Sequence, residues 1–217
     1  GSVVNGYESM AGLVNFEFKK PQEMPRLGIN AYQNRFGRSE LNLQGGLQLN
    51  ERWHMGLFGS GAAIYGNIDD NQDGFRDQAL SNTFNLLQRF SYQGPRMEAQ
   101  LGVQAYSDNK LGGQTTYTRA QPIGYGMELE SEHLSLFSKT GFFGKKPAQS
   151  LGVIAQLKFQ NMSGLYGLRT FTGTEKRAYL NAIYDDIIGS ADHKIKAGAS
   201  FQYLSLSQWA GQPFGTQ

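Results

Sequence analysis

The sequence predicts an all-β fold, an antiparallel transmembrane β-barrel segment. Apolar and polar residues alternate over runs of about ten residues, the length that a tilted membrane strand needs. The clearest runs lie at 40–50, 97–106, 151–160 and 194–203. A helix would scatter these apolar residues around its whole circumference, so strand is the better interpretation. Short and long connections also alternate along the chain, as they do in a barrel with brief periplasmic turns and long outer loops.

The alternation divides the chain into about eleven strands. Tight turns are predicted at 50–52, 94–95 and 161–164, where Asn, Gly and Pro gather. Longer polar or glycine-rich loops are predicted at 66–81, 107–121, 142–149 and 172–177. The expected strands are roughly 25–35, 39–49, 52–65, 82–92, 96–106, 122–131, 133–142, 150–160, 164–172, 178–187 and 193–207.

The two faces of each strand differ in what they tolerate. Turning Lys158 toward hydrocarbon costs about 2–4 kcal/mol near the bilayer midplane, and Glu98 somewhat less. The Leu, Val and Ala faces are therefore expected to meet lipid, and the Gln, Asn and Lys faces to line the lumen. Five aromatic residues fall near expected strand ends, where interfacial girdles occur: Trp53, Tyr65, Tyr92, Tyr106 and Trp209.

Composition narrows the class of protein. The 217 residues include 28 glycines, 12% aromatic and 18% charged residues, with no cysteine. A mean hydropathy of −0.46 and the lack of long apolar runs argue against helical membrane spans. The net charge of +2 gives no reason to expect nucleic acid as a partner.

The ends of the sequence predict a piece of a longer protein. Residues 1–6 lack the basic and apolar regions of a signal peptide, and residues 212–217 do not resemble a finished edge. Eleven strands would leave two unpaired edges in lipid, whereas bacterial single-chain barrels have even strand numbers.

An acidic loop is the best candidate for a metal site. Asp69, Asn71, Asp73 and Asp77 space oxygen side chains along the loop, and Phe75 offers a backbone carbonyl. Gly74, at the sixth position, permits the sharp turn that would bring these ligands together around calcium. The bidentate glutamate of an EF-hand is replaced by leucine at position 80, so other groups would have to complete the shell. The alternative is an ordinary solvated loop.

Catalysis is not expected. His54, His133 and His193 are isolated from one another, so neither a zinc cluster nor a catalytic triad can be assembled from them. Substrate contacts are instead sought in or beside the expected outer loops, where a large chelate would dock. The candidates are Tyr106, Tyr117, Arg119, Gln121, Phe142 and Phe143, with Lys145 and Lys146 beside them.

One segment carries a resemblance to a known family. Residues 2–16 read Ser-Val-Val-Asn-Gly-Tyr-Glu-Ser-Met-Ala-Gly-Leu-Val-Asn-Phe. This run resembles the end of the plug domain of TonB-dependent outer-membrane receptors, with Leu13 a small departure from the commoner residues. Segments 73–77, 85–90 and 110–114 look like receptors of the cobalamin-transporter type, particularly Bacteroidetes versions.

The resemblance implies both a domain organisation and a function. Residues 1–21 would be the C-terminal end of the plug, and 22–217 the first half of a 22-stranded plugged barrel. The receptors it resembles have calcium-ordered loops and carry out TonB-energised uptake across the outer membrane. Expected partners are outer-membrane lipid, the TonB complex through a part outside this sequence and a large chelate substrate, with a surface lipoprotein as a further candidate.

The substrate and two other functions stay open at this point. Cobalamin, a ferric siderophore or another metal chelate fits as cargo, and a glycan is a further candidate. The alternative function is a passive porin or a calcium-stabilised surface adhesin, and a soluble calcium-binding β-sandwich is a weaker one.

Overall fold

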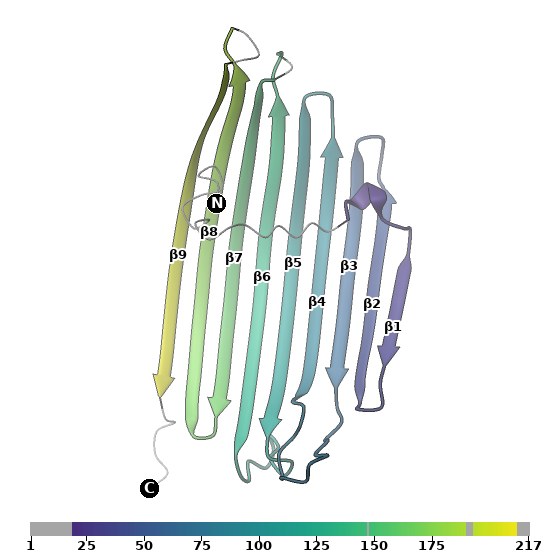
Figure 1. The fold of residues 1–217 in the computed structure, drawn as a ribbon, viewed down its shortest axis with the longest axis vertical. Helices are drawn as coiled ribbons and strands as arrows, with labels where there is room; N and C mark the ends of the chain where they lie inside the picture. The colour runs from purple at the N-terminus through teal and green to yellow at the C-terminus, as the bar shows by residue number, and fades with distance from the viewer. Residues whose placement is uncertain (1–18, 147, 190–192, 212–217) are drawn as a thin grey trace.

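The computed structural model describes residues 19–146, 148–189 and 193–211. They form one nine-stranded antiparallel sheet in which each strand pairs with its neighbour in sequence, from β1 to β9 (Figure 1). The all-β prediction is confirmed. No second sheet covers this one among the described residues, so they do not form a β-sandwich. None of the helices described there has the length and hydropathy of a membrane span.

One short helix and nine strands make up the described chain. The 3₁₀ helix η3 spans Pro21–Glu23 and begins with its proline, whose fixed φ suits a first helical position. The strands are β1 Gly28–Gln33, β2 Arg38–Gln48, β3 Trp53–Ile64, β4 Leu80–Gln93, β5 Met97–Gly113, β6 Gly126–Phe143, β7 Ser150–Tyr166, β8 Arg169–Ile187 and β9 Lys194–Gly211.

The expectation of eleven strands was wrong. The expected strands 122–131 and 133–142 are one strand, β6, and the expected loop 172–177 lies inside β8. The expected turn 161–164 is part of β7. Polar residues interrupt the apolar pattern at these places, but each has a backbone partner on both sides, as Glu132 has in Ser107 and Asn161. A paired ladder on both sides keeps the backbone extended whatever the side chains are.

In the corrected topology, the connections between strands lie alternately at the two ends of the sheet. The long-loop end carries connections 34–37, 65–79, 114–125 and 167–168, and the short-turn end carries 49–52, 94–96, 144–149 and 188–193. The two longest connections therefore lie together, at the bottom of Figure 1. The tight turns expected near 50 and 94 are confirmed. The expected outer loop 142–149 is on the short-turn end, because the merger of two expected strands into β6 reverses the direction of the next strand, β7.

Strand register places the apolar residues of all nine strands on one side, the apolar face. Directly paired residues share a face, so the four runs of the sequence prediction, which include Leu43, Leu101, Val153 and Ala199, lie on one side as expected. Many of these side chains are exposed, including Leu43 and Leu101, whereas the only buried hydrophobic residues in the described chain are Leu87, Ala99 and Tyr117. The sheet therefore has almost no core of its own.

The apolar face forms a band that crosses every strand, with polar interruptions at Gln88, Ser138 and Thr140 and charged residues at two places on its margin, Lys176 beside Phe159 and Asp186 beside Ile195. On β5 the band runs from Met97 to Ala105, about 26 Å along the strand at 3.3 Å per residue. Its members are Ile29 and Ala31; Leu41, Leu43 and Leu47; Met55 and Leu57; Phe84, Leu86, Phe90 and Tyr92; Met97, Ala99, Leu101, Val103 and Ala105; Leu134, Leu136 and Phe142; Leu151, Val153, Ala155, Leu157 and Phe159; Ala178, Leu180, Ala182 and Tyr184; and Ile195, Ala197, Ala199, Phe201 and Tyr203.

The same face becomes polar toward the long-loop end. Ser107, Glu132, Asn161, Thr174 and Ser207 pair in turn across β5 to β9 and form a continuous row. We call this row and the polar residues of the same face beyond it the collar. On β5 to β9 the change occurs within one or two residue pairs, so the band has a sharp boundary on these strands.

The five aromatic residues expected to form a girdle lie at different places on the sheet. Trp53 and Tyr92 pair at the short-turn end of the apolar face, with ring centroids 5.1 Å apart. Trp209 lies on the same face near the long-loop end, and Tyr65 is exposed just beyond β3. Tyr106 is different, because it lies well inside β5 on the opposite face.

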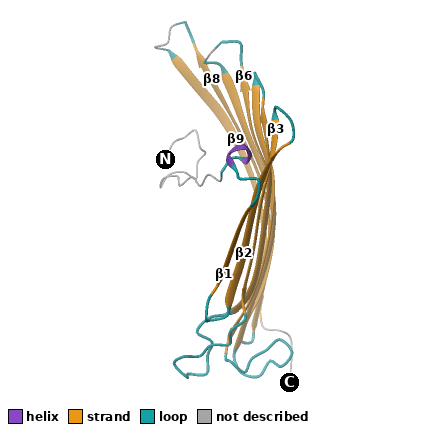
Figure 2. Ribbon diagram, turned by 90° about the vertical axis from the view of Figure 1, so that its right-hand side faces the viewer, coloured by secondary structure: helices purple, strands orange, loops and turns teal. Residues whose placement is uncertain are grey.

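The opposite face carries η3, on the concave side of the curved sheet (Figure 2). A cross-strand pair of glycines, Gly46 and Gly56, makes room for it. A Cβ on Gly46 would lie 2.6 Å from the Pro21 carbonyl oxygen, and one on Gly56 would lie 2.7 Å from the Met24 sulfur. Only glycine allows this close approach.

Hydrogen bonds hold the segment around η3 to the concave face. The buried Arg89 donates from Nη1 to the Lys19 carbonyl at 3.2 Å, and Ser91 Oγ donates to Gln22 Oε1 at 3.0 Å. The Gly46 amide donates to the Pro25 carbonyl at 2.8 Å. The expected plug segment, 1–21, falls for the most part outside the described residues.

Candidate functional site: the joined loops and the concave face

The two longest loops, 65–79 and 114–125, are bound to each other, and we call them the joined loops. Phe75 and Gln114 form an isolated antiparallel bridge. The Arg76 amide donates to the Gly113 carbonyl and the Thr115 amide to the Gly74 carbonyl, each at 2.9 Å. The joined loops thus extend the sheet by a short ladder beyond the strand ends.

Arg76 ties the joined loops together with its side chain. Its Nη1 donates to the Gln114 carbonyl at 2.6 Å, and its Nη2 donates to the Thr115 and Tyr117 carbonyls at 3.2 and 2.7 Å. Desolvation by burial lowers the pKa of Arg76 from its ordinary value. Hydrogen bonds from a charged donor are about twice as strong as neutral ones, so this side chain fixes the shape of the second loop.

The acidic part of the first loop turns as the sequence predicted. Gly74 has a φ of 83°, the left-handed conformation that favours glycine. Asp69 accepts the amides of Asp73 and Gly74 at 3.0 and 2.9 Å. Asp73 accepts the Phe75 amide at 2.8 Å, and Asp77 accepts the Asp70 amide at 2.8 Å. The carboxylates therefore already stabilise the turn by accepting backbone N–H groups.

These contacts bear on the predicted calcium ligands Asp69, Asn71, Asp73, Phe75 and Asp77. All five lie in one turn, but Asn71 Nδ2 donates to Asp73 Oδ2 at 3.0 Å. The atom of Asn71 that faces this carboxylate oxygen is therefore the amide nitrogen and not the amide oxygen. In the described part of the chain, no three His, Cys, Asp or Glu side chains are grouped closely enough to hold a metal ion. Calcium binding by this loop stays a prediction.

Tyr117 is the packing centre of the second loop. Only 3% of its surface is exposed, and its hydroxyl donates to Glu128 Oε1 at 2.8 Å. A Cβ at Gly126 would lie 2.2 Å from its ring, so glycine is needed there. Burial and the hydrogen bond to Glu128 raise the pKa of Tyr117. Its burial leaves little surface for the ligand contact that the sequence suggested.

The other loop candidates are more exposed. Arg119 forms ion pairs with Glu128 and Glu130, each at 3.2 Å, and so lies against the collar. Gln121 is exposed and closes a turn with Thr118 through backbone hydrogen bonds of 3.1 and 3.2 Å. These two side chains remain accessible at the long-loop end.

The six candidate substrate contacts do not converge. Phe142 and Phe143 end β6 at the short-turn end, as do Lys145 and Lys146 after them, whereas the candidates at positions 117, 119 and 121 are at the long-loop end. Tyr106 lies between, on the concave face. The 18 residues of β6 separate the ends by about 55 Å at 3.3 Å per residue, so one ligand cannot contact both groups.

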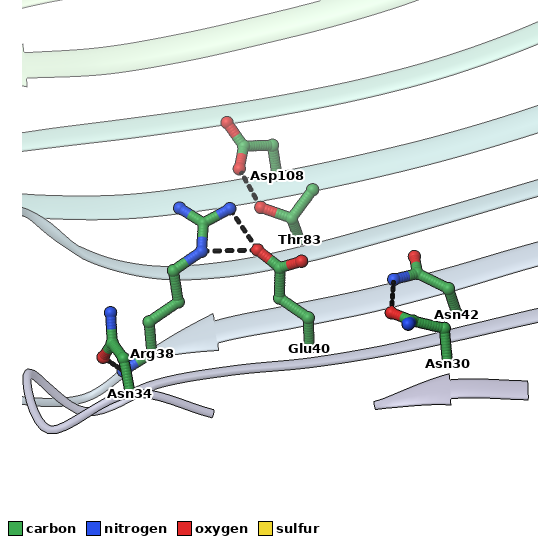
Figure 3. Close-up of polar contacts among 7 residues, drawn as sticks. All are labelled: Asn30, Asn34, Arg38, Glu40, Asn42, Thr83 and Asp108. Atoms are coloured by element: carbon green, nitrogen blue, oxygen red, sulfur yellow. Dashed lines mark hydrogen bonds and ion pairs between the residues drawn. The ribbon is translucent and has the colours of Figure 1, made fainter. Parts of the chain in front are cut away.

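Charged side chains gather on the concave face over β5–β9. Glu175 forms ion pairs with Lys158 at 3.4 Å and Arg177 at 3.3 Å, and Lys196 pairs with Asp185 at 3.2 Å. The buried Asp108 accepts the Thr83 hydroxyl at 2.7 Å (Figure 3), and Lys110 lies 3.1 Å from its other oxygen. We call this part of the face the charged sector.

A smaller area without charged side chains, which we call the uncharged sector, lies beside it within β1–β4, with Glu40 and Arg89 on the same face outside it. Asn30, Asn42, Ser60 and Asn85 are paired in turn across the four strands and so form one row. They line a cavity of about 450 Å³, together with Gln44 and Phe58 from the neighbouring row. Sequence reasoning missed this site, because the residues come together only through the register of four strands. The one usable signal was the run of amides on the polar side of 40–50.

Comparison with known proteins adds no assignment. No protein-family model matches this chain, and neither curated proteins nor solved structures give a significant match. The function must therefore be argued from the faces, loops and sectors described above.

Proposed function

We propose that the nine strands are part of the wall of a bacterial outer-membrane β-barrel that takes up a metal chelate, such as cobalamin or a ferric siderophore, with energy from TonB. In this proposal the apolar face meets lipid and the concave face lines the interior. The observation that carries the proposal is the apolar band, which crosses all nine strands on one face.

The band suits lipid better than water. A soluble protein rarely exposes a continuous apolar surface of this extent, and a single sheet must bury its apolar face against something. The band measures about 26 Å along a strand, and a membrane barrel carries an apolar band about 25 Å tall. Tilting of the strands would lower its height somewhat below its length.

A sheet in hydrocarbon must also close, because unpaired edge N–H and C=O groups have no partner in lipid. Among the described strands, β1 and β9 each have a single neighbour. The proposal therefore requires further strands that pair with both edges. Those strands would come from elsewhere in a longer protein.

The joined loops favour an orientation. Outer-membrane barrels place their longer loops outside the cell, so the long-loop end would face out, with the collar just above the lipid. The ladder between the loops and the three hydrogen bonds of Arg76 would keep them folded there. Calcium bound by the acidic turn is proposed as a further stabiliser of the same loop.

Active transport, rather than passive diffusion, is supported by the attachment of η3 to the concave face. A barrel that holds its preceding chain inside the lumen can block the pore, and residues 2–16 resemble the end of such a plug. Uphill uptake needs an energy input that changes ligand affinity between two states of the plug, since ligand binding alone supplies none. The alternative, a passive porin or calcium-stabilised adhesin, needs no such input.

Uptake by cells tests this proposal. A strain lacking the gene is complemented with the complete protein and given radiolabelled cobalamin or ferric siderophores, with and without a functional TonB. Accumulation that depends on both the receptor and TonB is the expected result. Equal passage of small solutes without TonB would instead identify a porin, and failure to recover the protein in the outer membrane would contradict the whole proposal.

A further inference from the structure

The peptide group between Asp73 and Gly74 has a chemical reactivity that the function proposed above does not use. It is the one Asp-Gly step of the chain. An aspartate side chain that precedes glycine can react with the glycine amide nitrogen, because glycine has no Cβ to obstruct the approach. A Cβ at Gly74 would meet nothing within 4 Å, so the space beside this residue is open. Asp73 is exposed, and water therefore reaches its carboxyl group.

The reaction has two steps. The Gly74 nitrogen bonds to Cγ of the Asp73 carboxylic acid, and the carboxyl hydroxyl and the amide hydrogen leave as water, which gives a cyclic imide. Water then cleaves one of the two bonds between the ring nitrogen and a carbonyl carbon. Cleavage of the bond to Cγ restores aspartate. Cleavage of the bond to the main-chain carbonyl carbon gives isoaspartate, in which the main chain runs through the former side chain.

The acidic turn restrains the nitrogen that must attack. The Gly74 amide donates to Asp69 Oδ2 at 2.9 Å, and the Asp73 amide donates to Asp69 Oδ1 at 3.0 Å. One carboxylate thus holds the peptide groups on both sides of Asp73 and fixes the backbone there. The negative charge of Asp69 also opposes the loss of the Gly74 amide proton that ring closure requires.

The Asp73 carboxylate is engaged by other groups. Its Oδ1 accepts the Phe75 amide at 2.8 Å, and its Oδ2 accepts Asn71 Nδ2 at 3.0 Å. A side chain that binds the backbone amide two residues ahead points along the turn and not back onto the next nitrogen. The turn therefore keeps the two reacting groups apart.

A change at this peptide group would reach the second of the joined loops. The Gly74 carbonyl accepts the Thr115 amide at 2.9 Å and the Thr115 hydroxyl at 3.3 Å, and Phe75 pairs with Gln114. Isoaspartate would add one carbon atom to the main chain between Cα of Asp73 and the Gly74 nitrogen. The ladder between the joined loops begins directly after this point, so the added atom would shift its register.

We propose that Asp73–Gly74 is a site of spontaneous conversion to isoaspartate, that the acidic turn suppresses this conversion through Asp69, and that conversion separates the joined loops. The carboxylate of Asp69 thus protects the loop against a covalent change. Neither a membrane location nor a bound ion is needed for this chemistry.

Ageing of the complete purified protein tests the proposal. Samples are incubated at neutral pH, either folded or unfolded in guanidinium chloride, and isoaspartate at position 73 is located by electron-transfer fragmentation of the peptide that contains it. Conversion at Asp73 leaves the mass unchanged, whereas conversion of Asn5, which also precedes a glycine, replaces an amide by an acid and changes the mass.

Three variants separate the role of Asp69 from that of charge. Asp69→Ala removes both acceptor oxygens, and Asp69→Asn keeps one. The control is Asp70→Ala, which removes a charge from the same turn. The Asp70 side chain makes no hydrogen bond or ion pair with a described residue, and its backbone amide, which donates to Asp77, is kept.

Isoaspartate is expected to form at position 73 at least about tenfold more slowly in the folded than in the unfolded protein. Asp69→Ala is expected to raise the rate in the folded protein at least about fivefold, as the loss of one or two hydrogen bonds to a carboxylate implies. Asp69→Asn raises it less, and Asp70→Ala changes it less than about twofold. Heat-modifiable migration in gels confirms that each variant is folded. Limited proteolysis is expected to cleave the joined loops faster as the isoaspartate content rises.

Four outcomes would overturn the proposal. Isoaspartate does not form at position 73 even in the unfolded protein, or it forms equally fast in the folded and unfolded protein. Alternatively, Asp69→Ala and Asp70→Ala convert at the same rate, or the aged protein is cleaved no faster than the fresh protein.

Discussion

The band and the collar lie on the same face of the same strands, yet they have opposite chemistry. On β6, Leu134 and Leu136 belong to the band, and Glu130 and Glu132 to the collar. Strands β5–β9 have 17 to 19 residues, whereas crossing a bilayer takes about 9–11. The backbone ladder thus continues well past the band. The difference teaches that the polarity of the side chains changes along a strand while the backbone pairing, and with it the strand, continues.

The comparison of the band with the collar is tested most strongly by placing a lysine on each side of the boundary between them. Under the proposed function, Leu136→Lys turns a charge toward lipid and is expected to destabilise the folded protein by about 2–4 kcal/mol. Glu132→Lys, on the same strand and face but in the collar, is expected to cost less than about 1 kcal/mol. Urea unfolding of the complete protein in lipid vesicles measures both. Equal costs would show that the boundary has no relation to lipid.

The joined loops extend the comparison beyond the collar, because hydrogen bonds hold them in place. Arg76→Leu removes three hydrogen bonds from a charged donor and is expected to destabilise the loop by about 3 kcal/mol. Arg119→Leu removes only exposed ion pairs, worth about 1 kcal/mol or less. Limited proteolysis of intact cells measures loop opening. Faster cleavage in the Arg119 variant than in the Arg76 variant would contradict this assignment.

On the concave face, two glycines, Gly46 and Gly141, allow a matched test of the η3 attachment. Gly46→Ala places a Cβ 2.6 Å from the Pro21 carbonyl oxygen and is expected to weaken the attachment by about 1–3 kcal/mol. Gly141→Ala meets nothing closer than 3.9 Å and is expected to have little effect. Hydrogen exchange of the residue 46 amide, which bonds to the Pro25 carbonyl, reports the attachment. Unchanged protection in the Gly46 variant would mean that η3 is not held there.

Tyr117 makes the joined loops sensitive to alkaline pH. Its pKa is raised in the folded state, so its contribution to loop stability is complete below the ordinary value of about 10 and is lost as pH rises through the raised value. Tyr117→Phe is expected to cost about 1 kcal/mol at neutral pH and to remove this part of the pH dependence. Proteolysis of the loop with an alkali-tolerant protease from pH 8 to 11 checks both. An identical pH profile in Tyr117→Phe would contradict it.

Calcium is expected to have the smallest effect. At 1 mM calcium, a site with a dissociation constant of 0.1–1 mM would stabilise the loop by about 0.4–1.4 kcal/mol. The Asp73→Ala and Asp77→Ala double variant is expected to lose calcium-dependent protease resistance. Calorimetry that detects no heat with millimolar calcium would show that this loop does not bind the ion.

The sequence predicted the all-β class, the gathering of the apolar runs on one face and the turn at Gly74, because each depends on local pattern or local backbone chemistry. It did not predict the length of β6 or β8, since Glu132 and Lys176 break the apolar alternation without breaking the backbone pairing. Because of this error, Phe142 and Phe143 were expected beside an outer loop, whereas they lie at the short-turn end. The cavity beside Ser60 was missed because its neighbours are set by register, which the sequence alone does not give.

The most direct test of the central claim uses spin labels on the complete protein in lipid vesicles, which the absence of cysteine from this chain makes simple. Single cysteines at Leu43 and Val153 of the apolar face are compared with cysteines at Gln44 and Gln156 of the concave face. Labels at 43 and 153 are predicted to collide with oxygen dissolved in lipid, and labels at 44 and 156 with a water-soluble nickel chelate. The reverse pattern, or water contact at all four positions, would contradict the account.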